Sequence, residues 1–137
     1  MPEKVFQKEI ISDPDLMPEI EEFILDIAVK VNLKEEKHNE LALSVAEAIS
    51  NCIVHGNKLD KNKKVTVTVI VDEKKMKIIF KDEGKGFNIS NVPDPTQPEN
   101  ILKDSGRGIH IMKSFIDELK YNFTPTGTET ILLVRLT

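Results

Sequence analysis

The stretch from Val65 to Val71 constrains the fold more than any other part of the sequence. Valine occupies every odd position of this stretch, and threonine or isoleucine occupies every even position. Branched side chains that alternate in this way predict a β-strand with one buried face. A turn at 72–75 separates the stretch from the apolar run 76–80, so the two runs predict a β-hairpin and an antiparallel sheet.

Two helices are expected before this hairpin and one after it. Apolar residues recur at helical spacing from Leu16 to Val31 and again from Leu41 to Cys52. Gly56 is expected to take the left-handed conformation that ends the second helix. In chain order we expect a strand at 4–11, a helix capped by Ser12 or Asp13, a helix at 34–55, strands at 65–71 and 76–80, a helix at 107–119, and strands at about 120–123 and 128–136.

This order predicts an α+β fold. Most neighbouring strands are joined by short turns, so the sheet is expected to be mixed but mostly antiparallel, with three helices on one face. The result is a two-layer α/β sandwich. The length of 137 residues suits a single domain spanning 1–137. A long irregular stretch, roughly 82–105, contains Pro93, Pro95 and Pro98, and loops of this length are usually functional or disordered.

Composition narrows the possible function classes. The formal net charge of −4 gives no reason to expect direct nucleic-acid binding, and the apolar runs are too short for a membrane span. Cys52 is the only cysteine, which excludes an intrachain disulfide and a cysteine-rich metal site. We therefore expect a soluble cytoplasmic protein.

Glu47 and Asn51 are the first pair of residues that could carry chemistry. They lie four residues apart on the expected second helix, so both side chains border the core on one face. A carboxylate beside a carboxamide suits a cation with oxygen ligands or an acid–base role. A solvated boundary face would have the same pattern. His55 continues the row and fits a helix end better than a ligand.

Three glycine-containing turns complete the set of candidate residues. Asp82 directly follows a strand, and Gly84 and Gly86 would let a ligand approach the backbone, although a plain turn remains open. Gly106 and Gly108 open a helix whose N-terminus could bind an anion, with Lys103 and Arg107 beside it, or form a simple loop-to-helix junction. Thr128, just after Gly127, could offer a hydroxyl to a ligand or simply favour a strand.

The order and spacing of these blocks are more specific than any one of them. They read Glu-x-x-x-Asn on a helix, Asp-x-Gly-x-Gly after a hairpin, Gly-x-Gly opening a helix, and Gly-Thr at the last strand. This series resembles the N, G1, G2 and G3 boxes of the GHKL ATPase superfamily, whose ATP-binding domain has the Bergerat fold. The resemblance runs from about Lys34 to the C-terminus. In its length and its EAISNCIVHGN block, the chain resembles the stand-alone anti-sigma-factor serine/threonine kinases.

The resemblance implies roles for individual residues in binding ATP and Mg²⁺. It implies that Asp82 accepts a hydrogen bond from the adenine amino group, that Asn51 coordinates Mg²⁺, and that Glu47 is the general base. It also implies that the segment between the G1 and G2 boxes is a lid over ATP. Further box residues would line the nucleotide site: Gly84, Gly86, Gly106, Gly108 and Thr128.

A cation beside the transferred phosphoryl group is expected near the G2 box. Arg107 is the first candidate and Lys103 the second. Arg107 stands between the two glycines, where many family members have a small or apolar residue, and His110 is similarly polar. These departures, with the three prolines of the lid, leave the lid geometry and the γ-phosphate contacts open.

The resemblance also implies a function. The chain would be an anti-sigma factor that binds a sigma factor, acts as a homodimer, and phosphorylates a serine or threonine of a STAS-type anti-anti-sigma partner. One alternative is a non-catalytic module in which nucleotide only stabilises a protein-binding surface. Another is the ATPase domain of a two-component histidine kinase, for which the sequence offers no phosphoacceptor helices.

Overall fold

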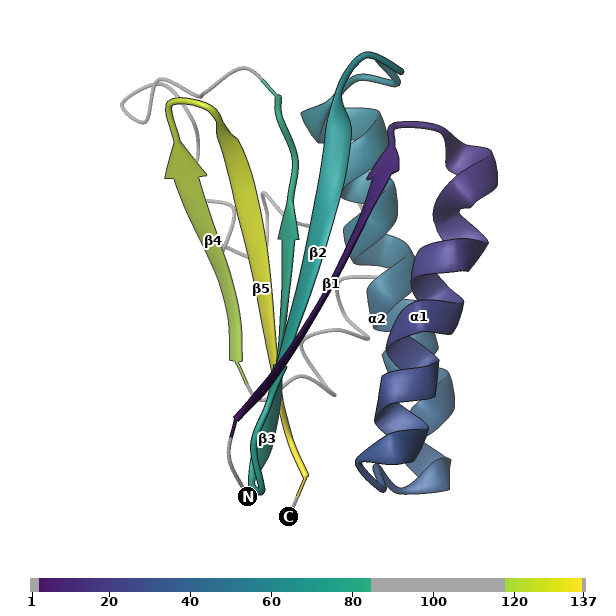
Figure 1. The fold of residues 1–137 in the computed structure, drawn as a ribbon. Coiled ribbons are helices and arrows are strands. Elements are labelled where there is room, and N and C mark those ends of the chain that lie inside the picture. The colour runs from purple at the N-terminus through teal and green to yellow at the C-terminus, as the bar shows by residue number, and fades with distance from the viewer. Residues whose placement is uncertain (1–2, 85–117, 137) are drawn as a thin grey trace.

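A five-stranded antiparallel sheet forms the centre of the molecule (Figure 1). The structure is a computed structural model that describes residues 3–84 and 118–136. The strands lie in the order β1-β2-β3-β5-β4, and each of the four pairings is antiparallel. Their bounds are β1 Lys4–Ile11, β2 Lys64–Val71, β3 Lys75–Lys81, β4 Glu118–Thr124 and β5 Gly127–Arg135.

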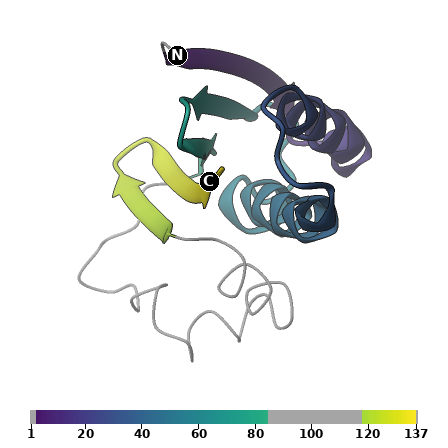
Figure 2. The same ribbon diagram turned by 90° about the horizontal axis from the view of Figure 1, so that it is seen from below.

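Two α-helices, α1 (Met17–Lys30) and α2 (His38–Ser50), lie side by side against one face of this sheet (Figures 1 and 2). Short 3₁₀ turns precede them at Pro14–Leu16 and Glu35–Lys37. Asp13 caps the first turn, because its Oδ1 accepts the Asp15 N–H at 2.9 Å. Within 3–84 and 118–136, no helix combines the length and the apolar content of a bilayer span.

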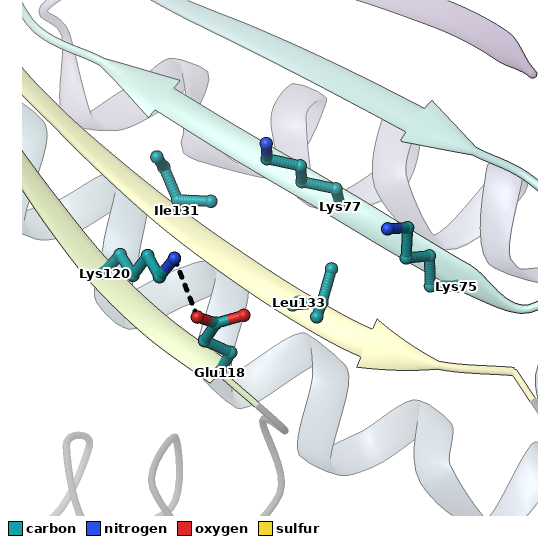
Figure 3. A pocket seen from close by; sticks show the side chains of 6 residues that line it. All are labelled: Lys75, Lys77, Glu118, Lys120, Ile131 and Leu133. Atoms are coloured by element: carbon teal, nitrogen blue, oxygen red, sulfur yellow. Dashed lines mark ion pairs between the residues drawn. The ribbon is translucent and has the colours of Figure 1, made fainter.

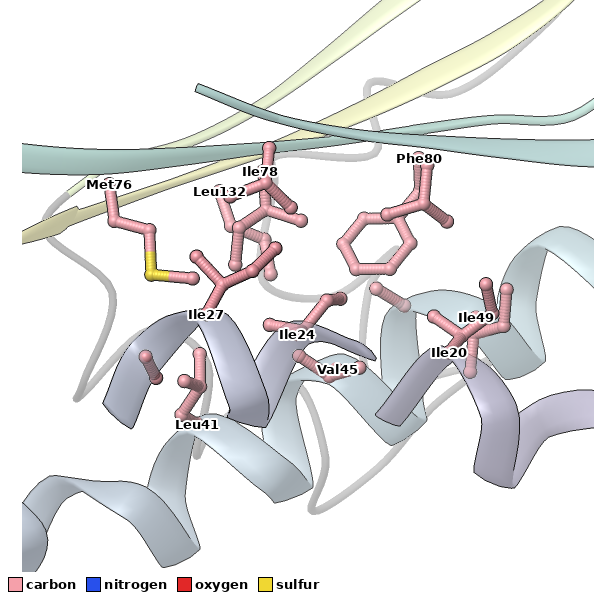
Figure 4. Packing of buried hydrophobic residues seen from close by; sticks show 14 of the residues in the cluster. Ile20, Ile24, Ile27, Leu41, Val45, Ile49, Met76, Ile78, Phe80 and Leu132 are labelled. Atoms are coloured by element: carbon pink, nitrogen blue, oxygen red, sulfur yellow. The ribbon is translucent and has the colours of Figure 1, made fainter. Parts of the chain in front are cut away.

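The core lies between the sheet and the two helices. Val65, Val67, Val69 and Val71 are fully buried, whereas the residues between them are only partly so, which confirms the predicted alternation. Figure 4 shows the α1 and α2 stripes facing β3 and β5. The labelled residues are Ile20, Ile24, Ile27, Leu41, Val45, Ile49, Met76, Ile78, Phe80 and Leu132, and all are buried.

The predicted α+β class and the antiparallel sheet are therefore confirmed. The third predicted helix falls mostly on residues outside the described ranges. Its last two residues were wrongly predicted, because Glu118 and Leu119 open strand β4. Leu119 is paired with Leu132 and packs on the core, so cross-strand contacts override the helix propensity of the Glu-Leu pair.

The end of the second helix also differs from the prediction. After Ser50 the chain continues as a π-helix, η3 (Asn51–Gly56), and Gly56 does not have the left-handed conformation. Lys58 and Leu59 have it instead, at φ values of 53° and 61°. The Leu59 N–H donates to Ile53 O at 2.8 Å, so the left-handed residues turn the chain back onto the last helical carbonyls.

The packing of α1 on the sheet predicts a contrast between two of its residues. Ile24 is fully buried and Val29 is 61% exposed. We expect Ile24→Ala to lower the free energy of unfolding by about 2–5 kcal/mol, because it removes buried methyl groups and leaves a cavity. Val29→Ala, on the same helix, should change it by less than about 0.5 kcal/mol. Urea unfolding followed by circular dichroism measures both, and equal effects would contradict the arrangement of this layer.

Candidate functional site

Asp82 lies where the chain leaves strand β3, and both its backbone and its side chain are held there. The Asp82 N–H donates to Thr128 O at 3.0 Å, which extends the β3–β5 pairing by one residue. The carboxylate oxygen Oδ1 accepts two backbone N–H groups, from Gly84 at 3.0 Å and from Thr128 at 3.1 Å. The carboxylate is thus fixed between the turn after β3 and the start of β5.

This carboxylate is only 4% exposed. Burial raises the pKa of Asp82 above its ordinary value, and the N–H groups of Gly84 and Thr128 partly offset the rise. A buried carboxylate with a raised pKa is one whose charge is incompletely compensated. An additional hydrogen-bond donor would stabilise it, so the site suits a ligand that presents an N–H or O–H group.

Three glycines leave the space that this arrangement needs. A Cβ atom on Gly56 would overlap the Asp82 carboxylate, and one on Gly84 would overlap the carbonyl of Gly56. Gly127 has a φ of +156°, and a Cβ there would overlap the Asp82 carbonyl oxygen. The π-helix, the turn after β3 and the start of β5 therefore meet at backbone contact distance around one carboxylate.

Thr128 leaves a polar atom unsatisfied beside Asp82. The residue is 8% exposed, and its Oγ1 is the one buried side-chain nitrogen or oxygen within 3–84 and 118–136 that lacks a hydrogen-bond partner. Such an atom costs about 1–3 kcal/mol and is rare in native proteins without a functional reason. An unpartnered hydroxyl next to a buried carboxylate makes this region a candidate site for a polar ligand.

The helical run α2–η3 brings two more candidate residues toward this site. Glu47 lies in the last turn of α2 and Asn51 opens η3, and both are partly buried. The Asn51 N–H donates to Glu47 O, so the two residues are one helical turn apart. The same run ends at Gly56 against Asp82. Burial is the main cause that raises the pKa of the Cys52 thiol, and the negative charge of Asp82 is the second. The second cause is a further sign that the helical run lies close to Asp82.

The remaining predicted site residues lie outside the described ranges: Gly86, Lys103, Gly106, Arg107 and Gly108. Conversely, the structure shows that two glycines not predicted as site residues, Gly56 and Gly127, approach Asp82 closely. Gly56 and Gly127 were read as a helix end and a turn, yet both are required by close approach to Asp82. No local pattern distinguishes such glycines, because the contacts join segments far apart in the chain.

A separate hollow of about 230 Å³ lies on the sheet face opposite α1 and α2 (Figure 3). Ile131 and Leu133 form its floor and lysines form its rim, with Lys120 Nζ 2.8 Å from Glu118 Oε1. It contains neither a buried carboxylate nor a glycine turn. The Asp82 region is therefore the stronger candidate for a ligand site.

A comparison with known families places the chain in one of them. Residues 10–134 match the family model described as "Histidine kinase-like ATPase domain". The chain belongs to this family. The match takes in α1, α2, η3 and the residues around Asp82.

Curated relatives carry a more specific name. Proteins named "Anti-sigma F factor" from Bacillus thuringiensis, Bacillus cytotoxicus and Bacillus mycoides are each 37% identical over 102 residues. The aligned region covers 73% of this chain and 70% of each relative. Over most of its length, the chain is therefore similar to anti-sigma F factors.

Solved structures support the fold. The blue-light activated histidine kinase EL346 of Erythrobacter litoralis superposes with a TM-score of 0.61 at 16% identity, covering 83% of this chain and 41% of that one. The histidine kinase domain of the same protein gives 0.60 at 18% identity, covering 90% and 60%. The chain thus spans less than two thirds of either solved chain, and at these identities the likeness concerns the fold alone.

The environment of Asp82 predicts a pH-dependent effect of Asp82→Asn on stability. The asparagine keeps an acceptor for both N–H groups and removes the charge. Because burial raises the pKa of Asp82 above its ordinary value of 3.8, the charged form destabilises the parent above its folded pKa, and protonation relieves this as pH falls. We expect the variant's stability relative to the parent to be greatest near about pH 7 and to decline toward about pH 4.

Urea unfolding of both proteins at a series of pH values measures this difference. The other titrating groups are common to the two proteins, so their contributions cancel. A difference that stays constant with pH would contradict the proposed environment of Asp82.

Proposed function

We propose that the protein is an ATP-binding anti-sigma factor and a serine/threonine protein kinase that phosphorylates a STAS-type anti-anti-sigma protein. The observation that carries this proposal is the Asp82–Thr128 site, a buried carboxylate and an unpartnered hydroxyl among three closely approaching glycines. Membership of an ATPase domain family and 37% identity to anti-sigma F factors support it.

The residues of the site fit the base of ATP. The adenine amino group is a hydrogen-bond donor, and it would add a third donor to the two N–H groups that the Asp82 carboxylate already accepts. The Thr128 hydroxyl can donate to a ring nitrogen or accept from bridging water. Gly84 and Gly56 keep side chains out of the volume beside the carboxylate. Together these groups would hold the base end of the nucleotide.

The phosphate end is assigned to the helical run. ATP supplies the γ-phosphoryl group for transfer to a hydroxyl, with Mg²⁺ neutralising phosphate charge. Asn51 would contribute one amide oxygen to Mg²⁺, an ion that prefers oxygen ligands and retains several waters. Glu47, one helical turn away, would accept the proton of the attacking hydroxyl. We also assign Gly86, Gly106 and Gly108 to the nucleotide and Arg107, or else Lys103, to the transferred phosphoryl group.

The partners follow from the same family likeness. We propose that a sigma factor is bound directly and that the chain is one cytoplasmic domain that forms a homodimer. The candidate dimer surface includes the edge strand β1, where Val5 is 61% exposed, and the outer side of α1, where Val29 is equally exposed. Apolar side chains on an edge strand and an adjacent helix are typical of such a contact.

Asp82→Asn is expected to weaken binding of ATP far more than it affects folding. An asparagine can keep the two backbone bonds but loses the charge that strengthens the bond to the adenine amine. We expect the dissociation constant to rise about 10- to 100-fold, which corresponds to a charge-assisted hydrogen bond of about 1.5–3 kcal/mol. Isothermal titration calorimetry measures it. Asp26→Asn, on the exposed side of α1, is the matched control, and an unchanged affinity for Asp82→Asn would refute the adenine assignment.

Glu47→Gln is expected to separate catalysis from binding. Without a carboxylate to accept the proton, phosphotransfer should slow by about 10²- to 10⁴-fold, whereas the affinity for ATP should change little. The assay incubates the protein with labelled ATP, Mg²⁺ and STAS proteins encoded nearby. Glu40→Gln, on the exposed face of α2, is the control. Full transfer by Glu47→Gln would remove Glu47 from catalysis, and no transfer by the parent would favour a non-catalytic anti-sigma module.

A further inference from the structure

Asn57 is a buried polar residue directly after the π-helix, with 1% of its surface exposed. Its backbone N–H donates to Cys52 O at 2.8 Å, the i→i+5 bond that closes η3. Its side chain points away from this helix end and bonds to three other parts of the chain. Asn57 is not among the residues of the proposed nucleotide site.

Every hydrogen-bonding group of the Asn57 carboxamide is used. Nδ2 donates to Ser12 Oγ at 2.6 Å and to Lys64 O at 3.0 Å, and Oδ1 accepts the Glu83 N–H at 2.7 Å. A backbone N–H can only donate and a carbonyl can only accept, so these partners determine which atom is oxygen and which is nitrogen. Aspartate would lose both donors, and alanine would lose all three bonds.

The bond to Glu83 lies within the turn that forms the ligand site. Glu83 sits between Asp82, whose carboxylate faces the site, and Gly84, whose N–H holds that carboxylate. The Glu83 side chain adds a second tie, because its Oε2 accepts the Lys64 N–H at 3.0 Å. The 82–84 turn is therefore fixed from β5 through Thr128 and from the opposite side through Asn57.

We infer that Asn57 is a positioning residue for nucleotide binding, which acts by holding the Glu83 peptide so that the Asp82 carboxylate and the Gly84 N–H keep their geometry. This inference rests on the proposed function. Asn57 itself does not touch the nucleotide. Its effect passes through the Glu83 peptide, which lies between the Asp82 carboxylate and the Gly84 N–H that donates to it.

Ser12 offers a matched control for a purely structural role. Its Oγ donates to Lys63 O at 2.9 Å and accepts from Asn57, so Ser12→Ala breaks the far end of the same network. The bond from Glu83 to Asn57 remains in that variant. Both Asn57→Ala and Ser12→Ala should lower the melting temperature, but only Asn57→Ala should disturb the 82–84 turn.

The test combines local amide hydrogen exchange with titration of ATP and ADP. For Asn57→Ala we expect the Glu83 and Gly84 amides to exchange at least about tenfold faster, relative to the amides of Ile78 and Ile79 in β3, and the nucleotide dissociation constant to rise about tenfold. Ser12→Ala should leave both ratios within about twofold. Equal effects of the two variants, or a uniform rise in exchange, would overturn the inference.

The inference can still be tested if Asn57→Ala does not fold or if the parent protein binds no nucleotide. If Asn57→Ala does not fold, the parent must still show a Glu83 amide protected at least about 100-fold although the residue is exposed, and an unprotected amide overturns the inference. If the parent binds neither ATP nor ADP, the proposed function fails. The hydrogen-exchange comparison of the two variants then still decides whether Asn57 positions this turn.

Discussion

The buried Asp82 carboxylate is the constraint on which the rest of the site depends. A carboxylate at 4% exposure is unfavourable unless donors surround it, and the chain provides two backbone N–H groups to one of its oxygens. Three glycines also let the surrounding backbone approach this carboxylate closely. Gly56 and Gly127 meet Asp82, and Gly84 meets the carbonyl of Gly56, each at a distance that excludes a Cβ atom.

The π-helix has a role in the same arrangement. An α-helix closes i→i+4 bonds, whereas the Asn57 N–H reaches back five residues to Cys52 O. The wider turn changes where the residues after Ser50 lie, and it delivers Gly56 to the Asp82 carboxylate and the Asn57 side chain to the Glu83 peptide. Single π turns are frequent at functional sites because they redirect side chains without ending the helix. Here the turn joins the Glu47–Asn51 helix to the buried carboxylate.

Periodicity predicted the parts of this structure that depend on local pattern. The alternation in 65–71 predicted a half-buried strand, and the apolar stripes predicted both helices, because burial of one face determines each pattern. The order of their motifs also predicted Asp82, Gly84 and Thr128 as site residues, and the structure places these three residues together. The π turn, the close approach of Gly56 and the hydrogen bonds of Asn57 were not predictable in this way. They arise where helix, hairpin and last strand meet, and a single sequence carries no signal for contacts between such distant segments.

Asp82 and Thr128 also bear on which base the proposed function would select. Two N–H donors compensate the charge of the buried carboxylate only in part, and within the described residues the Thr128 hydroxyl has no hydrogen-bond partner. Both are costs to the folded protein that a suitable ligand would remove. Adenine presents an amino donor at position 6, next to a ring nitrogen that accepts. Guanine presents an acceptor oxygen at that position, so in the same orientation two acceptors would face each other and the Asp82 carboxylate would gain no further donor. In this orientation the proposed function would distinguish the two bases through one buried group, because a polar site disfavours a ligand that leaves its buried atoms unpaired.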